Sequence, residues 1–119
     1  MSTIIASNIS DGTTSVPSTY VVNGSAKAWV NFNGTGTVAI RESLNTTSIT
    51  DGGTGLYWQN FTSSMSTTTY NVIASTHWRG IVNSDAWETG RVYFLGADTS
   101  TNSPSDRSYI FTAVWGDLA

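Results

Sequence analysis

The chain has 119 residues, a net charge of −3 and no cysteine, which suits one domain and excludes a disulfide framework or a thiolate metal site. Only 11% of the residues are charged, against about 25% in average soluble domains. Its few cations are scattered, so no basic cluster can neutralise several phosphates, and we expect no nucleic-acid partner. No apolar run approaches about 18 residues, so we expect no membrane insertion.

The composition is polar but largely uncharged, and it is rich in Ser, Thr and Gly. Thr favours half-buried strands, and Ser and Gly favour turns. This composition is typical of a β protein that lies outside the cell or on the surface of a particle. It does not fit a helical cytosolic enzyme.

Residues 1–24 are polar and rich in turn signals, with a small apolar group around Ile4, Ile5 and Ile9. Asp11-Gly12 and Asn23-Gly24 each predict a turn or hairpin, and the residue before Pro17 favours an extended segment. Two interpretations stay open for this arm. It is a flexible arm with one edge strand, or an anchor arm that becomes ordered on a larger assembly.

Residues 26–40 contain the clearest strand and turn of the chain. Side chains alternate from Ala26 to Phe32, so that Val30 falls on one face and Trp29 on the other. The sequence Asn-Gly-Thr-Gly at 33–36 then reverses the chain, because Asn and Gly tolerate positive φ. The core covers one face, and Trp29 on the opposite face requires a second cover.

Further strands are predicted at 56–61, 70–75, 91–95 and 108–115, with a turn at 51–55 and a polar loop at 96–107. In all, about seven short strands are separated by turn signals at intervals of about 10 residues, which is typical of a sandwich or barrel. We therefore predict an all-β fold. It comprises one antiparallel β-sandwich, jelly-roll-like, over residues 25–119, preceded by an extended N-terminal arm over residues 1–24.

Two of these strands carry bulky side chains on both faces: the strand around Trp29 and the last strand, which ends at Trp115. Five tryptophans do not fit easily into one small core. A strand with one face in the core and the other against a neighbouring subunit explains this pattern best. We therefore expect a homo-oligomer with Trp29 and Trp115 at its interface.

Residues 76–90 show no regular pattern and hold the only histidine, His77, together with Trp78, Arg79 and Trp87. Aromatic and cationic side chains of this kind form binding hot spots, and tryptophan stacks on sugar rings. Two interpretations stay open: these residues fill a subunit interface, or they form a surface recognition site. Trp58 joins that site if its side chain points outward.

The sequence contains no pattern that predicts catalysis. Glycines cluster between residues 34 and 55 without a phosphate-binding pattern, and no Gly-x-Ser-x-Gly motif is present. One histidine cannot form a multi-histidine metal site. We expect a protein that is not an enzyme and that has no cofactor and no metal.

Several segments resemble a family of small tail-fibre-like or virion structural proteins of marine and cyanobacterial tailed phages. They are KAWVNFNGTGTVAIRESLN from Lys27, SITDGGTG from Ser48, the first residues MSTI and the last residues GDLA. The likeness is strong over residues 26–65 and at the C-terminus, and it does not extend over residues 76–107. The chain departs from the family pattern at Leu56 and Trp58, where Asp and Thr are more usual.

The resemblance implies a non-enzymatic virion structural protein at the phage particle surface, assembled as a trimer. Its N-terminal arm would attach to other virion proteins. Two roles remain open: a tail fibre that binds a glycan or protein of the host surface, and a capsid decoration, cement or head-fibre protein. Apart from the resemblance, a carbohydrate-binding module remains an alternative.

Overall fold

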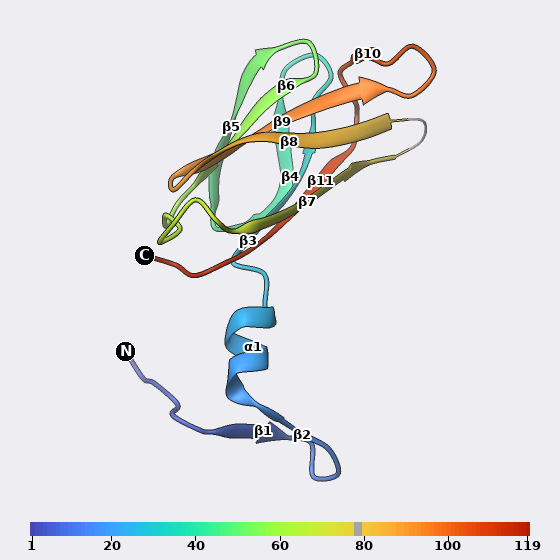
Figure 1. Cartoon of the computed structure of the whole chain (residues 1–119). Coiled ribbons are helices and arrows are strands. Elements are labelled where there is room, and N and C mark those ends of the chain that lie inside the picture. Colours follow the sequence, from blue (N-terminus) through green and yellow to red (C-terminus); the bar gives the residue numbers. More distant parts are fainter. Residues whose placement is uncertain (78–79) are drawn as a thin grey trace.

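The computed structural model of the protein describes residues 1–77 and 80–119 and shows a β-sandwich that stands on an N-terminal arm (Figure 1). Strands make up 54% of the chain and helix 6%, so the predicted all-β class is confirmed. In chain order the elements are β1 (Asn8–Ser10), β2 (Ser15–Pro17), α1 (Ser18–Gly24), β3 (Ala28–Asn33), β4 (Ala39–Leu44), β5 (Thr46–Gly53), β6 (Leu56–Phe61), β7 (Asn71–Thr76), β8 (Gly80–Glu88), β9 (Arg91–Asp98), β10 (Ser103–Pro104) and β11 (Ile110–Trp115).

The arm consists of the β1–β2 hairpin and the short helix α1. The hairpin turns at Gly12, whose φ of 97° is readily adopted only by glycine, as Asp11-Gly12 predicted. The helix was not predicted, since seven residues are too few to show a helical period. Asn23 and Gly24, which we interpreted as a turn, are the last residues of this helix.

One sheet of the sandwich has the order β4-β3-β11-β7, with every pair antiparallel. The β3–β4 pair is the predicted hairpin around residues 33–36. Strand β11 lies between β3 and β7, so the first and last strands of the sandwich are neighbours, as they are in a jelly roll. The hairpins β3–β4, β5–β6 and β8–β9 each stay within one sheet.

The other sheet has the order β5-β6-β9-β8, and β10 extends it by pairing with Asp98 and Ala97, beyond the part of β9 that pairs with β6. Three predictions for this sheet were wrong. The loop predicted over residues 96–107 contains the end of β9 and the strand β10. Residues 80–88 are not irregular but form β8, because pairing along β9 outweighs the low strand propensity of their polar residues. Strand β5 also continues to Gly53, through the first part of the predicted turn.

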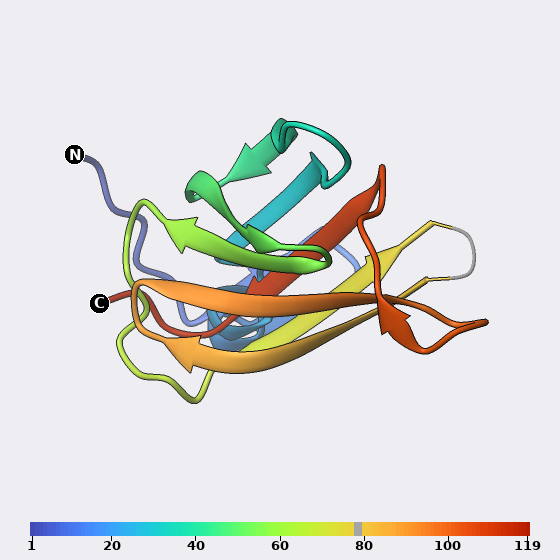
Figure 2. The ribbon, with the colours of Figure 1, turned by 90° about the horizontal axis from the view of Figure 1, so that it is seen from above.

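The two sheets stack face to face and enclose the core, and Figure 2 shows the layers from above. Strands β3, β6, β9 and β11 alternate buried and half-buried or exposed residues, as the sequence predicted. The core forms two apolar clusters, one around Phe61 and Phe94 and one around Phe32 and Tyr57.

The end of the sandwich far from the arm is closed by hydrogen bonds of Tyr57. Its hydroxyl donates to the carbonyl of Gly34 at 2.9 Å and to a carboxylate oxygen of Asp106 at 2.7 Å. A Cβ at Gly34 would lie 2.4 Å from the Tyr57 oxygen, so only glycine fits this turn. Gly55 donates its N–H to the same Asp106 oxygen at 2.8 Å, which joins the β3–β4 and β5–β6 turns to the segment before β11.

Candidate interaction surfaces

The outward face of sheet β4-β3-β11-β7 carries a row of apolar side chains that crosses all four strands. The pairing register places Leu44, Trp29, Ala113 and Ile73 side by side in this order. Trp29 and Ala113 are half-buried, while Leu44 and Ile73 at the two edges are 47% and 64% exposed. We call this surface, together with Phe111 and Trp115 in the adjacent positions of β11, the Trp29 face.

The sequence placed two residues at an oligomer interface, and the structure puts both Trp29 and Trp115 on the Trp29 face. Ile73 and Leu44 were not singled out. The signal for Ile73 was present, because Val72 and Ala74 alternate with it and pack against the core. Leu44 ends its strand and gives no comparable pattern.

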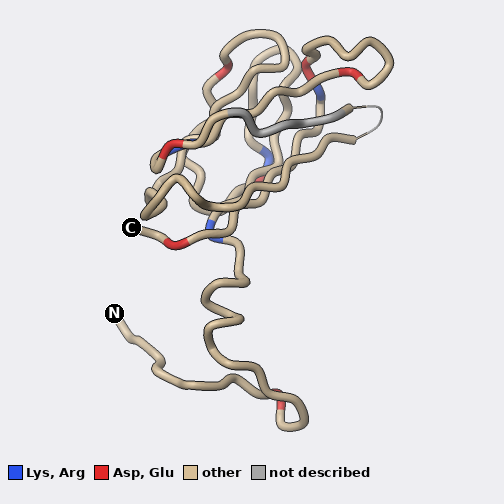
Figure 3. Tube along the Cα trace, in the orientation of Figure 1, with Lys and Arg blue, Asp and Glu red and all other residues tan. Residues whose placement is uncertain are grey.

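The Trp29 face is almost free of charge. Among the described residues, the charged residues of the Trp29 face are Arg41 and Glu42, which are adjacent and opposite in sign. Lys27 lies at the end of this face that is nearest to the arm. Of the other acidic residues that the structure describes, Asp11 lies on the arm, Asp51, Glu88 and Asp98 lie on strands of the other sheet, and Asp106 and Asp117 lie before and after β11. Acidic positions are red in Figure 3. Among the described residues, the negative charge therefore lies mostly away from this face.

An aromatic cluster lies at the upper end of the Trp29 face. The guanidinium carbon of Arg41 lies 3.8 Å from the ring centroid of Tyr109. His77, one of the predicted recognition residues, contacts the same ring edge-on at 5.0 Å. Tyr109 in turn stacks near Phe111 at 6.2 Å. His77 therefore belongs to the surface of the four-stranded sheet.

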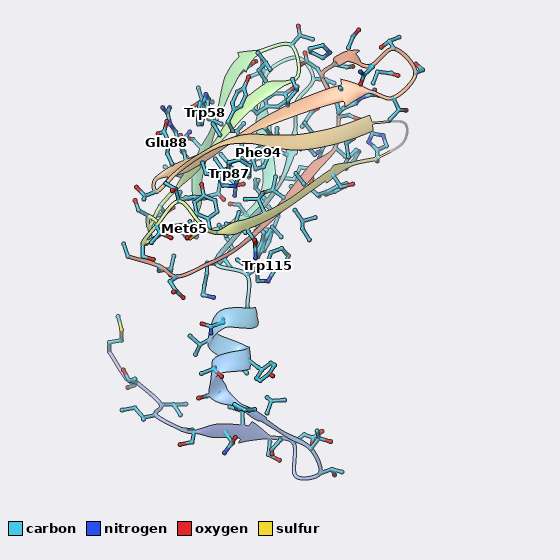
Figure 4. The ribbon with its side chains drawn as sticks, viewed as in Figure 1. Trp58, Met65, Trp87, Glu88, Phe94 and Trp115 are labelled. Atoms are coloured by element: carbon cyan, nitrogen blue, oxygen red, sulfur yellow. The ribbon has the colours of Figure 1, made fainter. Side chains whose placement is uncertain are left out.

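Trp58 points outward, but from the other sheet (Figure 4). Its ring centroid lies 4.8 Å from that of Tyr93 and 4.1 Å from the guanidinium carbon of Arg91. Arg91 also pairs with Glu88 at 2.8 Å, and the hydrogen bond from Arg91 lowers the pKa of the Glu88 carboxyl. Trp58, Tyr93, Arg91 and Glu88 thus form one connected surface cluster.

The structure does not unite the predicted recognition residues into one site. Trp87 pairs with Val92, on the opposite face of the same sheet from Trp58, and is 40% exposed (Figure 4). His77 lies on the other sheet. Trp78 and Arg79 lie outside the described residues. Sequence proximity suggested one aromatic loop, whereas the β8 strand carries Trp87 away from His77.

The N-terminal arm presents exposed apolar side chains, and none of its residues is buried in the described structure. Every residue of the arm is exposed except Ser18, and α1 contains no buried residue. Ile4 and Ile5 are 95% and 94% exposed, and Tyr20 is 71% exposed. The other exposed apolar residues of the arm are Met1, Ile9, Val16, Val21 and Val22.

Several hydrogen bonds connect the arm to the sandwich. The indole N–H of Trp115 donates to the carbonyl of Gly24 at 3.0 Å. The Lys27 ammonium donates to the carbonyls of Val22 and Ser25 at 2.5 and 2.8 Å, where a cation also complements the helix C-terminus. A cavity of about 210 Å³, lined by Asn23, Thr67, Thr69, Tyr70, Gly116 and Asp117, remains beside this joint.

The described residues do not assemble a metal site, since they contain no group of three His, Asp or Glu side chains that could hold an ion. Over the same residues, no helix has the length and hydropathy needed to cross a membrane. The chain matches no protein-family model, no curated protein and no solved structure.

Proposed function

We propose that the protein is a non-enzymatic structural subunit on the surface of a tailed-phage particle, assembled as a trimer and attached through its N-terminal arm. The observation that carries this proposal is the exposure of eight large apolar side chains on residues 1–24. The resemblance of residues 27–45 and of the C-terminal GDLA to phage virion proteins supplies the kind of particle.

The arm requires a partner for physical reasons. Isolated helices shorter than about 12 residues are marginal in water even for sequences that favour helix. The seven residues of α1 include two β-branched valines, and the helix has no side-chain N-cap. Its stability must come from packing of its apolar side chains, and none of the residues of α1 is buried in the described structure.

The arm and several turns lie at opposite ends of the molecule, and this arrangement supports a fibre-type role. The arm leaves one end of the sandwich, while the β3–β4 and β5–β6 turns and the loop before β10 lie at the other end (Figure 1). A subunit attached by its arm therefore presents these turns and loops to the surroundings. We propose that they face the host surface, as the receptor-binding end of a tail fibre.

The proposal is tested on particles purified by density from lysates that produce the chain with an epitope tag after Ala119. We expect the full chain to band with the particles and a chain lacking residues 1–24 to remain unbound, while its circular dichroism spectrum keeps the β-sheet signal of the sandwich. A Trp58→Ala variant, altered on the other sheet, is the matched control and should still bind.

Two results would overturn the proposal. One is that the full chain does not band with the particles, and the other is that the chain lacking residues 1–24 still does. Gold labelling of the tag on bound particles then assigns the role. Label on the tail supports the fibre, and label on the head replaces it with capsid decoration.

A further inference from the structure

We infer that copies of this chain assemble with their Trp29 faces turned toward a common axis, so that the β4 edge of each copy meets the β7 edge of the next. This inference deepens the proposed function and rests on it for the copy number of three and for arms that point in one direction. The Trp29 face and the β4 and β7 edges are features of the sandwich and do not depend on the proposed function.

The Trp29 face has the composition of a protein interface. Interface cores are depleted of charged residues and enriched in aromatic residues and arginine. Trp29, Phe111 and Trp115 share this face with Leu44 and Ile73, and the last two are about half exposed or more. Leaving this row in water forgoes the hydrophobic stabilisation that a partner burying it would provide.

The distribution of charge favours a second copy as the occupant. The chain carries a net charge of −3, so two copies repel each other if their acidic surfaces meet. The Trp29 face avoids this repulsion, since the acidic residue that it does carry, Glu42, is next to Arg41. Contacts between Trp29 faces therefore bring together surfaces that carry no excess of negative charge.

The position of the arm favours a parallel, cyclic arrangement over a dimer whose two-fold axis is perpendicular to the strands. Lys27 and Trp115, the two residues that hold α1, lie at the lower end of the same face. Parallel copies around an axis therefore bring their α1 helices together and cover Tyr20 and the two valines. A two-fold axis perpendicular to the strands would instead send the arms to opposite ends.

In a cyclic assembly every copy has the same orientation, so each contact joins unlike edges. Leu44 on β4 and Ile73 on β7 are the two ends of one cross-strand row, so they lie at the same height. Within one chain they are separated by three strand spacings, about 14 Å in total. A disulfide requires Cα atoms about 4.4–6.8 Å apart, so cysteines at these two positions can join only different copies.

The test uses the purified full chain, whose lack of cysteine makes engineered pairs unambiguous. A variant with both Leu44→Cys and Ile73→Cys, oxidised gently, should run without reductant as a covalent species of three times the chain mass of 12.7 kDa. Each single variant should remain at the mass of one chain in the same gel. A Thr50→Cys and Ile73→Cys pair, with Thr50 exposed on the other sheet, is the matched control and should also give no covalent trimer.

A second variant separates assembly from folding. Because Ile73 is 64% exposed, Ile73→Asp should leave the fold of one copy intact and reduce the mass in native mass spectrometry to that of one chain. The control Thr50→Asp should keep the trimer. The inference is overturned if the unmodified chain is monomeric, if Leu44→Cys alone gives a covalent dimer, or if Ile73→Asp remains trimeric. A trimer that fails to bind particles would refute the proposed function and leave this inference standing.

Discussion

Gln59 on β6 and Thr112 on β11 form a hydrogen bond of 2.7 Å across the middle of the sandwich, where both side chains are buried. The amide nitrogen of Gln59 also donates to the Thr46 hydroxyl at 2.8 Å. These groups separate the Phe61 cluster of the core from the Tyr57 cluster. Any shift of one sheet relative to the other would leave buried polar groups without partners, so this pair helps to specify one register.

Thr112→Val keeps the shape of the side chain but removes the donor, which leaves the Gln59 carbonyl oxygen buried without it. We expect the free energy of unfolding to fall by about 1–3 kcal/mol, measured by urea denaturation. Thr37→Val, at an exposed loop position, is the control and should change little. The double variant Gln59→Met and Thr112→Val should cost less than the sum of the single changes, and additive effects would show that the two residues are not coupled.

Tyr57→Phe removes the hydroxyl that donates to Gly34 and Asp106. We expect a loss of about 1–3 kcal/mol in the free energy of unfolding, because both acceptors lose a donor in a partly buried position. Tyr20→Phe, on the exposed arm, provides the comparison and should have no effect. Equal stability of the two variants would refute the assigned role of the Tyr57 hydroxyl.

Stability should decline at alkaline pH. Burial raises the pKa of Tyr70 to about 12, and burial together with the hydrogen bond to Asp106 raises the pKa of Tyr57. An unfolded tyrosine has a pKa of about 10, so between about pH 10 and 12 the folded state binds more protons than the unfolded state. The stabilisation is complete below pH 10 and is lost as the pH rises.

Urea denaturation at a series of pH values from 9 to 11.5 measures this decline. Tyr70→Phe and Tyr57→Phe should each make it shallower, because each removes one of the two titrating groups. An unchanged free energy of unfolding across this range would contradict the prediction.

Trp115→Phe should loosen the arm without unfolding the sandwich. The change removes the hydrogen bond to Gly24, which is worth about 0.5–1.5 kcal/mol and corresponds to about a 2- to 12-fold larger population of released arm. Chymotrypsin cleavage after Tyr20 in α1 should accelerate by a similar factor. Trp58→Phe serves as the control, and equal rates for the two variants would refute the role of Trp115.

The sequence predicted the parts of the fold that depend on neighbouring residues. Alternation assigned Val30 to the core and Trp29 to the outward face of β3, since a strand with one buried face repeats every two residues. In β6, β9 and β11 it divided the side chains between two faces without showing which face is inward. The expected interface residues Trp29 and Trp115 both lie on the outward face. Turn residues at 33–36 and at Asp11-Gly12 located two hairpins correctly.

Other features depend on residues far apart in the chain. Strand β8 is recognisable only through its pairing with β9, and the bond between Gln59 and Thr112 joins residues 53 positions apart. The separation of Trp58 from His77 and Trp87 follows from which sheet, and which face of it, each occupies. No pattern among neighbouring residues shows which sheet or face these three side chains occupy. The helix α1 was missed for another reason, since it is too short to show a helical period.

The pairing of β3 with β11 has a consequence for biosynthesis. Strand β3 begins at Ala28, whereas its central partner β11 ends at Trp115. Long-range pairing of this kind is slow, because a large loop must close first. The Trp29 face is therefore completed only after β11 has been synthesised, and a polypeptide that stops before β11 lacks the middle of this face. Sheet topology thus makes formation of the face depend on a strand made long after β3.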